Sequence, residues 1–349
     1  PHAVAYALLH LNAAPQPMRH ALRWCATLLA LVAAEPPCYA TREARVAPVR
    51  GAWVARGERQ SSYRNLSCPL EWSKYSCVHQ GQAARAAAAA GRGFAPAGCA
   101  LGGAWRPRGN GTRVFFWGDS LLRQVFIAMA CGLHAAGRVV DAAADWPPCG
   151  AAEWPCHGAA RCVRCGPGSG FFGATVTLAT GAELRTVSTD APGGAVAFFH
   201  DVQPDRDVVV VEAGVHGGSP FANAQRVLAA ARPLFARSVR VIWVVTPQDA
   251  FPSRSGDGRF EPKYLRSHRG GCVKSVAPAR SSEEWRALRG DARALDALWG
   301  VIDLAGLEDQ GDAKVGAGLA GGDCQHYCMP GPPDVLAAAL DAMLAALPA

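Results

Sequence analysis

Hydrophobic residues follow two kinds of pattern along the larger, second part of the chain. Short runs that are almost wholly apolar predict core strands, at residues 113–117, 207–212, 239–246 and 300–304. The first three runs are nearly continuous, which is typical of strands buried on both faces of a parallel sheet. Apolar residues at helical spacing predict helices at residues 121–136, 221–237, 282–299 and 334–347. This alternation predicts an α/β fold with three layers, helix–sheet–helix, around a central parallel sheet with right-handed crossovers.

The first predicted strand ends in Gly118-Asp119-Ser120. Gly118 permits a sharp turn, and the helical pattern that begins at Leu121 places Ser120 at a helix N-terminus. Backbone N–H groups and the positive end of the helix dipole can stabilise an oxyanion there. Ser120 is therefore a candidate nucleophile, and its own N–H is a candidate oxyanion-hole donor. The alternative is that Ser120 only caps the helix.

Asp323 and His326 are the candidate partners of this serine. In a Ser-His-Asp triad the aspartate orients the imidazole, and the other ring nitrogen takes the serine proton. Residues three positions apart share one face of a helical turn, so Asp323 and His326 can meet. The alternatives are an ordinary surface pair and a zinc site that includes Cys324 and Cys328. No second ligand pair at finger-like spacing accompanies these residues, so we expect no bound metal.

These motifs belong to longer blocks of the chain. The two main blocks are Gly118-Asp119-Ser120-Leu121-x-Arg123 and Asp323-Cys324-x-His326-Tyr327-Cys328-x-Pro330-Gly331-x-Pro333-Asp334. Three shorter blocks precede them, Gly51-x-Trp53-Val54, Cys68-Pro69 and Phe94-x-Pro96-x-x-Cys99. In this order the blocks resemble the plant trichome-birefringence-like proteins of the PC-esterase group, within the SGNH/GDSL superfamily.

The resemblance implies an SGNH-like fold and an O-acetyltransferase that modifies cell-wall polysaccharides in the Golgi lumen. It implies an acetyl-Ser120 intermediate, with His326 as the general base and Asp323 as the residue that orients it. The partner is then a polysaccharide acceptor. No cofactor is bound, and acetyl-CoA or another acetyl carrier serves as the co-substrate.

The same resemblance supplies candidates for the rest of the site. Gly214 lies where the family has its Thr-Gly-His-Trp element, so its backbone N–H is a candidate oxyanion-hole donor, although His216 stands one place later than the family's histidine. Arg123 and Gln124 are candidate substrate-binding residues. For Arg123, an ion pair that only supports the fold is the alternative.

Two other functions remain open on this sequence. An esterase that removes acetyl groups from glycans would use the same triad, because only the second acceptor differs, water in place of a sugar hydroxyl. A glycan-binding or wall-organising protein with a vestigial triad is the other alternative. Intact Ser120, Asp323 and His326 argue against that second alternative.

The chain has 13 cysteines, and the resemblance implies that six of them form disulfides in an oxidising lumen. These six are Cys68, Cys77, Cys99, Cys272, Cys324 and Cys328. The family's first cysteine, expected just before Gly51, has no counterpart, so we expect one disulfide to be absent or rewired. An insertion at residues 149–165 holds four more cysteines and His157, which predicts a disulfide-stapled loop or, alternatively, a zinc knob.

The amino-terminal part of the chain predicts a targeting segment and a small lobe. We interpret residues 1–17 as an extension before a start at Met18, and residues 18–40 as a signal peptide. The apolar run at residues 24–34 is short against the roughly 20 residues of a membrane span, so cleavage is favoured over a short anchor. This places the protein in the secretory pathway, in the Golgi lumen or secreted, with membrane contact only through an uncleaved leader. Residues 50–110 then form a cysteine-containing lobe and residues 111–349 the catalytic domain.

Charge excludes one class of partner and favours another. The formal net charge is +7, yet no basic stripe with interleaved aromatic residues is present, so we expect no nucleic-acid binding. A mild positive excess favours an acidic glycan, since positive fields steer anionic partners.

Overall fold

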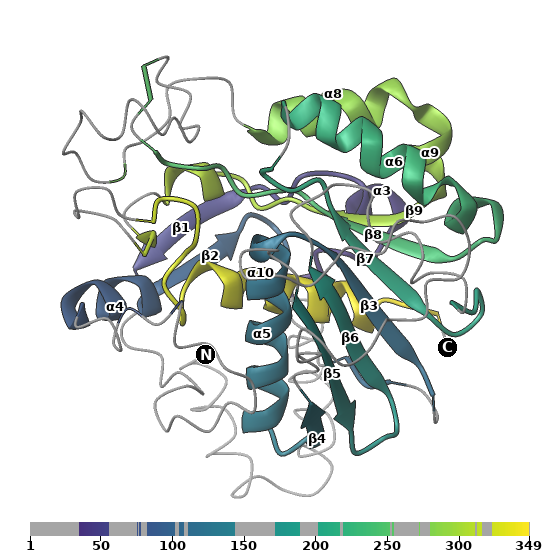
Figure 1. The fold of residues 1–349 in the computed structure, drawn as a ribbon, viewed down its shortest axis with the longest axis horizontal. Coiled ribbons are helices and arrows are strands. Elements are labelled where there is room, and N and C mark those ends of the chain that lie inside the picture. Colours follow the sequence, from purple (N-terminus) through teal and green to yellow (C-terminus); the bar gives the residue numbers. More distant parts are fainter. Residues whose placement is uncertain are drawn as a thin grey trace, which may run out of the picture.

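The structure, a computed structural model, describes residues 35–55, 75, 77, 82–101, 105–107, 111–143, 172–188, 202–216, 219–251, 253–254, 272, 280–310, 313–315 and 323–348. Within these residues, seven strands form one sheet in the order β4-β5-β6-β3-β7-β8-β9, as Figure 1 shows. The predicted extension, most of the predicted leader, Cys68 and the cysteine-rich insertion lie outside the described part of the chain.

Five neighbouring strands of this sheet run parallel. They are β6 (Glu183–Ser188), β3 (Arg113–Gly118), β7 (Val208–Glu212), β8 (Arg240–Val244) and β9 (Leu298–Ile302). At one edge the sheet continues with antiparallel pairs formed by β4 (Val139–Ala143) and β5 (Phe172–Leu178). The predicted central parallel sheet is confirmed for these five strands, while the antiparallel β4 and β5 at the edge make the whole sheet mixed and largely parallel.

The four predicted core strands are confirmed as β3, β7, β8 and β9. The predicted helix at residues 282–299 is wrong in its extent, because the segment forms two helices and the start of a strand. These are α8 (Arg280–Gly290), α9 (Ala292–Ala297) and β9. Asp291 interrupts the predicted helix between α8 and α9. It is the N-cap of α9, and its side chain accepts a hydrogen bond from Ala294 N at 3.0 Å.

Helices cover both faces of the sheet, as the alternation of buried residues along β7 shows. Val208 and Val210 belong to one apolar core, together with α5 (Ser120–Ala135) and α10 (Pro332–Ala345). Val209 and Val211 belong to the other core, together with α6 (Pro220–Ala236), α8 and α9. The two groups of helices lie on opposite sides of the sheet in Figure 1. This arrangement confirms the predicted order of helix, sheet and helix.

The amino-terminal lobe packs onto the first of these cores. It comprises α3 (Arg42–Arg45), β1 (Gly51–Ala55), α4 (Ala83–Ala90) and β2 (Arg92–Pro96), with β1 and β2 paired antiparallel. Tyr39 and Phe94 are buried in the same apolar cluster as the residues of α5 and α10. The lobe is thus continuous with the core beneath the sheet.

Cys38 lies inside this folded lobe. It forms a disulfide with Cys99, and the neighbouring Tyr39 is fully buried. Cys38 N also donates a hydrogen bond to Ala100 O at 3.1 Å. Residues 38–40, assigned to the leader on sequence, are therefore folded onto this lobe.

Candidate active site

The turn between β3 and α5 presents Ser120 at the carboxyl edge of the sheet. Asp119 is the N-cap of α5, and its Oδ1 accepts a hydrogen bond from Leu121 N at 2.8 Å. Ser120 is the first helical residue, so its N–H has no acceptor within the helix. The capping role thus falls to Asp119, and the alternative interpretation of Ser120 as the cap is wrong.

Gly118 allows this turn to be tight. A Cβ atom at this position would lie 2.8 Å from Leu122 Cβ and 2.9 Å from Glu212 Oε2. Glu212 Oε2 also accepts a hydrogen bond from Leu122 N at 3.0 Å, so it cannot move away freely. Only glycine fits between the first turn of α5 and the end of β7.

The structure brings Ser120, His326 and Asp323 into one hydrogen-bonded relay. Ser120 Oγ lies 2.6 Å from His326 Nε2, and His326 Nδ1 lies 2.6 Å from Asp323 Oδ2. Serine and histidine are buried, whereas the Asp323 side chain is 33% exposed. This is the order of groups that a triad requires, with the serine proton directed at one ring nitrogen and the carboxylate at the other.

Asp323 is held as a carboxylate by the loop that it begins. Its Oδ1 accepts hydrogen bonds from Gln325 N and His326 N, each at 3.0 Å. Burial raises the pKa of Asp323, but the hydrogen bond and charge of His326 and the two backbone N–H groups outweigh it and lower the pKa to about 2. The carboxyl group beside His326 is therefore ionised at neutral pH.

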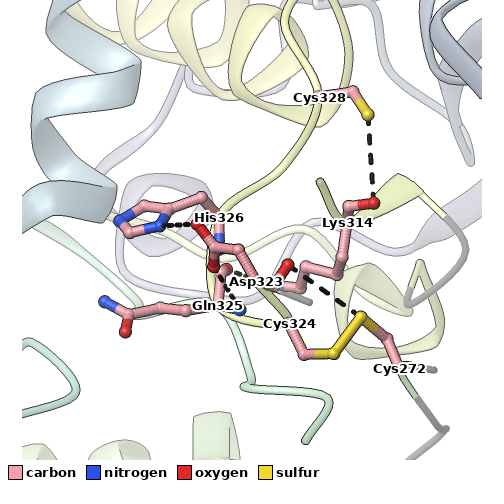
Figure 2. Close-up of a disulfide and its surroundings, with 7 residues drawn as sticks. All are labelled: Cys272, Lys314, Asp323, Cys324, Gln325, His326 and Cys328. Atoms are coloured by element: carbon pink, nitrogen blue, oxygen red, sulfur yellow. Dashed lines mark hydrogen bonds and ion pairs between the residues drawn. A yellow bond between two sulfur atoms is a disulfide. The ribbon is translucent and has the colours of Figure 1, made fainter. Parts of the chain in front are cut away.

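Covalent and backbone contacts fix this loop on several sides. One disulfide joins Cys324 to Cys272, and a second joins Cys328 to Cys77 in the amino-terminal lobe. Figure 2 shows Cys272–Cys324 beside Asp323, with Lys314 behind the loop. The short segment 313–315 pairs with the loop, since Val315 N donates to His326 O at 2.8 Å and Cys328 N donates to Ala313 O at 2.8 Å.

The two predicted substrate-binding residues have different positions. Gln124 is fully buried, and its amide donates to Tyr327 O at 2.8 Å and accepts from Tyr327 N at 3.1 Å. It is a positioning residue rather than the predicted substrate contact, because both ends of its amide are used by the loop. Arg123 donates a hydrogen bond to Tyr75 Oη, and the Tyr75 ring lies 5.0 Å from that of His326. Arg123 thus stands beside the triad and supports it through Tyr75.

Gly214 follows β7 and lies close to Asp119. Its φ is +74°, and a Cβ there would lie 3.0 Å from Asp119 Oδ2, so glycine is required. Val215 N donates to Asp119 Oδ2 at 2.7 Å, which ties this loop to the cap of α5. Gly214 N donates to Thr246 Oγ1 at 3.1 Å. The N–H predicted to serve an oxyanion is therefore engaged by Thr246 in this structure.

Gln325, His216 and Lys314 lie at the site but were not predicted from the sequence to be part of it. Gln325 Nε2 lies 3.1 Å from Ser120 Oγ and 3.5 Å from His216 Nε2. Lys314 Nζ donates to Gln325 O at 2.6 Å, and burial lowers the pKa of this lysine. Gln325 occupies a position that the Asp-Cys-x-His block leaves unspecified, so only its place between Asp323 and His326 could have drawn attention to it.

Buried acids lie behind the nucleophile. Burial and the nearby Asp119 and Glu284 charges raise the pKa of Glu212 well above its usual range. Burial also raises the pKa of Glu284, to about 7, although hydrogen bonds from Thr246 and Trp243 oppose the shift. These carboxyl groups lie at the ends of β7 and on α8, where they support the loops that follow the strands.

The disulfides indicate the compartment in which the protein folds. Five of the six predicted cysteines form disulfides in the described residues, namely Cys77, Cys99, Cys272, Cys324 and Cys328. Cys131, which was not singled out, is also disulfide-bonded. Three disulfides with both partners described indicate an oxidising, extracytoplasmic compartment. No helix within the described ranges is long and apolar enough to span a membrane.

Comparisons with known proteins assign no family to the chain. No protein-family model matches it, and no curated protein matches it. The resemblance to the trichome-birefringence-like proteins therefore rests on the sequence blocks quoted above, and functional arguments have to start from the site itself.

Proposed function

We propose that this protein is a serine acyltransferase that moves an acetyl group onto hydroxyls of a polysaccharide. The observation that carries the proposal is the relay from Ser120 through His326 to Asp323, with 2.6 Å at both steps. A serine becomes nucleophilic when an adjacent base can take its proton and a third group orients that base. Both conditions are met at the carboxyl edge of the parallel strands, where active sites of open α/β sheets form.

In the first half of the reaction Ser120 takes up the acetyl group. Its Oγ attacks the carbonyl carbon of the donor while His326 Nε2 accepts the hydroxyl proton, and Asp323 stabilises the imidazolium that forms. The tetrahedral intermediate then collapses, the bond to the donor's leaving group breaks, and His326 returns the proton to that group. The product is an ester between the acetyl group and Ser120.

In the second half a sugar hydroxyl replaces the leaving group. His326 Nε2 accepts the proton of that hydroxyl, and its oxygen attacks the acetyl-Ser120 carbonyl carbon. When this second tetrahedral intermediate collapses, the bond to Ser120 Oγ breaks and the proton returns to the serine. The balance is one acetyl group moved from donor to acceptor, with the enzyme restored.

The acetyl group, the polysaccharide acceptor and the Golgi lumen come from the family resemblance. The oxidising compartment indicated by the disulfides is compatible with a Golgi protein and equally with a secreted one. The donor in this proposal is acetyl-CoA or another acetyl carrier. A net charge of +7 supports a negatively charged acceptor glycan.

Hydrolysis is the second candidate, and one observation favours it. The Asp323 side chain is 33% exposed, so water reaches the edge of the triad. Water that replaced the sugar hydroxyl in the second half would make the protein an acetyl esterase. The ratio of transfer to hydrolysis depends on how well a bound acceptor excludes that water.

The test uses the full chain, produced through a secretory host so that its disulfides form. Purified protein is incubated with acetyl-CoA or p-nitrophenyl acetate, with and without xylan or pectin oligomers, and products are followed by mass spectrometry. Transfer predicts oligomers that gain acetyl units, whereas hydrolysis predicts donor loss without an acetylated oligomer. An acetylated Ser120 peptide should accumulate in short incubations.

Ser120→Ala is the matched control, because it removes one oxygen atom and leaves the fold in place. We expect this variant to lose transfer and hydrolysis alike. Activity that survives the substitution would show that another group is the nucleophile. A wild-type protein that neither transfers nor hydrolyses, and never acquires an acetyl group, would favour the glycan-binding alternative.

A further inference from the structure

We propose that the side-chain amide of Gln325 is an oxyanion-hole donor, which works with the backbone N–H of Ser120. The inference rests on the proposed function, since it concerns the same acyl-transfer site. It starts from the 3.1 Å contact between Gln325 Nε2 and Ser120 Oγ.

The direction of the relay decides which end of the amide faces the serine. The Ser120 hydroxyl gives its proton to His326 Nε2, 2.6 Å away, so the remaining lone pairs of Oγ need a donor. An amide NH₂ group can supply one, whereas the amide oxygen cannot. A second N–H of the same group points toward His216 Nε2 at 3.5 Å, which leaves the carbonyl end of the amide directed away from the nucleophile.

The backbone of Gln325 is held firmly enough to aim this amide. Gln325 N donates to Asp323 Oδ1 at 3.0 Å, and Gln325 O accepts from Lys314 Nζ at 2.6 Å. The preceding residue, Cys324, is tied to Cys272 by a disulfide. A donor on such a fixed segment needs little rearrangement as charge develops, and this is the property that makes an oxyanion hole effective.

During acylation, negative charge develops on the acetyl carbonyl oxygen, close to the side-chain amide of Gln325. When Ser120 Oγ bonds to the acetyl carbon it becomes an ester-like oxygen and a poorer acceptor. The negative charge then resides on the former carbonyl oxygen, which is attached to the same carbon atom. The N–H that faced Oγ can turn to this neighbouring oxygen without any movement of the loop.

The other predicted donor is not in position for this role. Gly214 N donates to Thr246 Oγ1, and Gly214 O accepts from Arg280 Nη1 at 3.0 Å, so the peptide groups around Gly214 are engaged on both sides. The Ser120 N–H at the start of α5 has no acceptor within the helix and supplies one donor. Gln325 Nε2, 3.1 Å from Ser120 Oγ, supplies a second.

The test compares Gln325→Met and Gln325→Glu with the wild-type chain. Methionine keeps the length and flexibility of the side chain but removes the donor, and glutamate replaces the donor with a negative charge. The matched control is Gln203→Met, the same substitution at an exposed site before the amino end of β7. The probe is p-nitrophenyl acetate, and the acylation rate of Ser120 is measured before the steady state, together with KM and the thermal midpoint.

We expect Gln325→Met to slow acylation by about 100-fold or more, the effect of losing one oxyanion-hole donor, with KM and the thermal midpoint nearly unchanged. Gln325→Glu should be at least as slow, because its charge opposes the oxyanion, and Gln203→Met should match the wild type. Inactivation by an alkyl fluorophosphonate should slow in parallel, since its phosphoryl oxygen takes the place of the oxyanion.

Two results would overturn the inference while the proposed function stands. One is that Gln325→Met acylates Ser120 at the wild-type rate, and the other is that KM rises while the acylation rate holds, which would make Gln325 a donor-binding residue only. If the wild-type protein itself never acylates at Ser120, the proposed function fails first and the inference fails with it.

Discussion

Gln124 and Tyr327 form a two-way hydrogen-bonded pair, in which the side-chain amide of one residue engages both backbone groups of the other. The pair joins α5, which carries the nucleophile, to the loop that carries the general base. Since Gln124 is fully buried, no water can replace either bond. Gln124 therefore helps to hold Ser120 and His326 at the separation seen in the relay.

Replacement of Gln124 by Leu should weaken both the fold and the relay. It removes the hydrogen bonds that Gln124 makes with the buried Tyr327 N–H and C=O, and the loss of such a buried bond costs about 1–3 kcal/mol. We expect a lower free energy of unfolding in urea and a fall in kcat, with a smaller effect on KM. Retention of full kcat would mean that the loop is positioned adequately by its disulfides alone.

Asp323→Asn should lower kcat by about 10⁴-fold, as expected when the carboxylate that fixes the imidazole tautomer is lost. In the wild-type protein the pKa of Asp323 is lowered to about 2, so this residue does not titrate between pH 4 and 8. Asp323 should therefore add no inflection of its own to the acidic limb of the pH–rate profile in that range. A second inflection in kcat/KM near pH 4 would contradict this assignment.

Stability should depend on pH through Glu284. Its pKa is raised by burial to about 7 in the folded protein, against an ordinary value of 4.5 in the unfolded chain. Between these values the unfolded chain has lost the proton that the folded protein still holds, so stability falls as pH rises, by about 1.4 kcal/mol for each pKa unit. The free energy of urea unfolding, measured from pH 4.5 to 8, should decline less steeply in Glu284→Gln than in the wild type.

Glu212 provides the background for that comparison. Its pKa is also raised, and it contributes a slope of the same sign in both proteins. Because the Glu284 charge is one cause of that raised pKa, Glu284→Gln also reduces the Glu212 slope, which adds to the expected difference in the same direction. Parallel slopes for the wild type and Glu284→Gln would show that Glu284 is already ionised in the folded protein near neutral pH.

Two disulfides that close loops of similar length allow an effect on stability to be distinguished from an effect on catalysis. Cys272–Cys324 closes 52 residues and Cys38–Cys99 closes 61, so loss of either should cost about 4 kcal/mol of unfolding free energy by the chain-entropy relation. Only the first adjoins Asp323. We expect the double variant Cys272→Ser/Cys324→Ser to lose most of its kcat.

The matched variant Cys38→Ser/Cys99→Ser should keep its kcat at temperatures where it remains folded. Thermal midpoints and kcat values for both variants, measured at the same temperature, test the contrast. Equal losses of kcat would show that catalysis follows global stability and not the anchoring of the loop.

Sequence alone predicted the parts of this structure that repeat a simple period over many residues. The apolar runs of β3, β7 and β8 and the long helices α5, α6 and α10 were identified within two residues at either end. The break at Asp291 was missed, because a single capping residue interrupts an otherwise helical pattern. Strands β5 and β6 were missed because buried and partly exposed residues alternate along them, so they form no continuous apolar run.

The triad was predictable because Ser120, Asp323 and His326 stand in recognisable blocks, but the surrounding contacts were not. Gly214 matched a family element, yet its N–H turns to Thr246, which is 32 residues away. Gln124 resembled a substrate contact because sequence does not show that both ends of its amide are used by Tyr327. Such pairings depend on how the loops after different strands meet, and local pattern carries no information on that.

The covalent link between Cys77 and Cys328 also joins two segments that are synthesised far apart in time. These cysteines are 251 residues apart, so the ribosome delivers the second long after the first. Ser120 is made early, but until the segment from Asp323 to Cys328 has emerged it has no base and remains an ordinary alcohol. Oxidation then completes the loop, so under the proposed function the nucleophile would be activated only after the two ends of the fold have been joined.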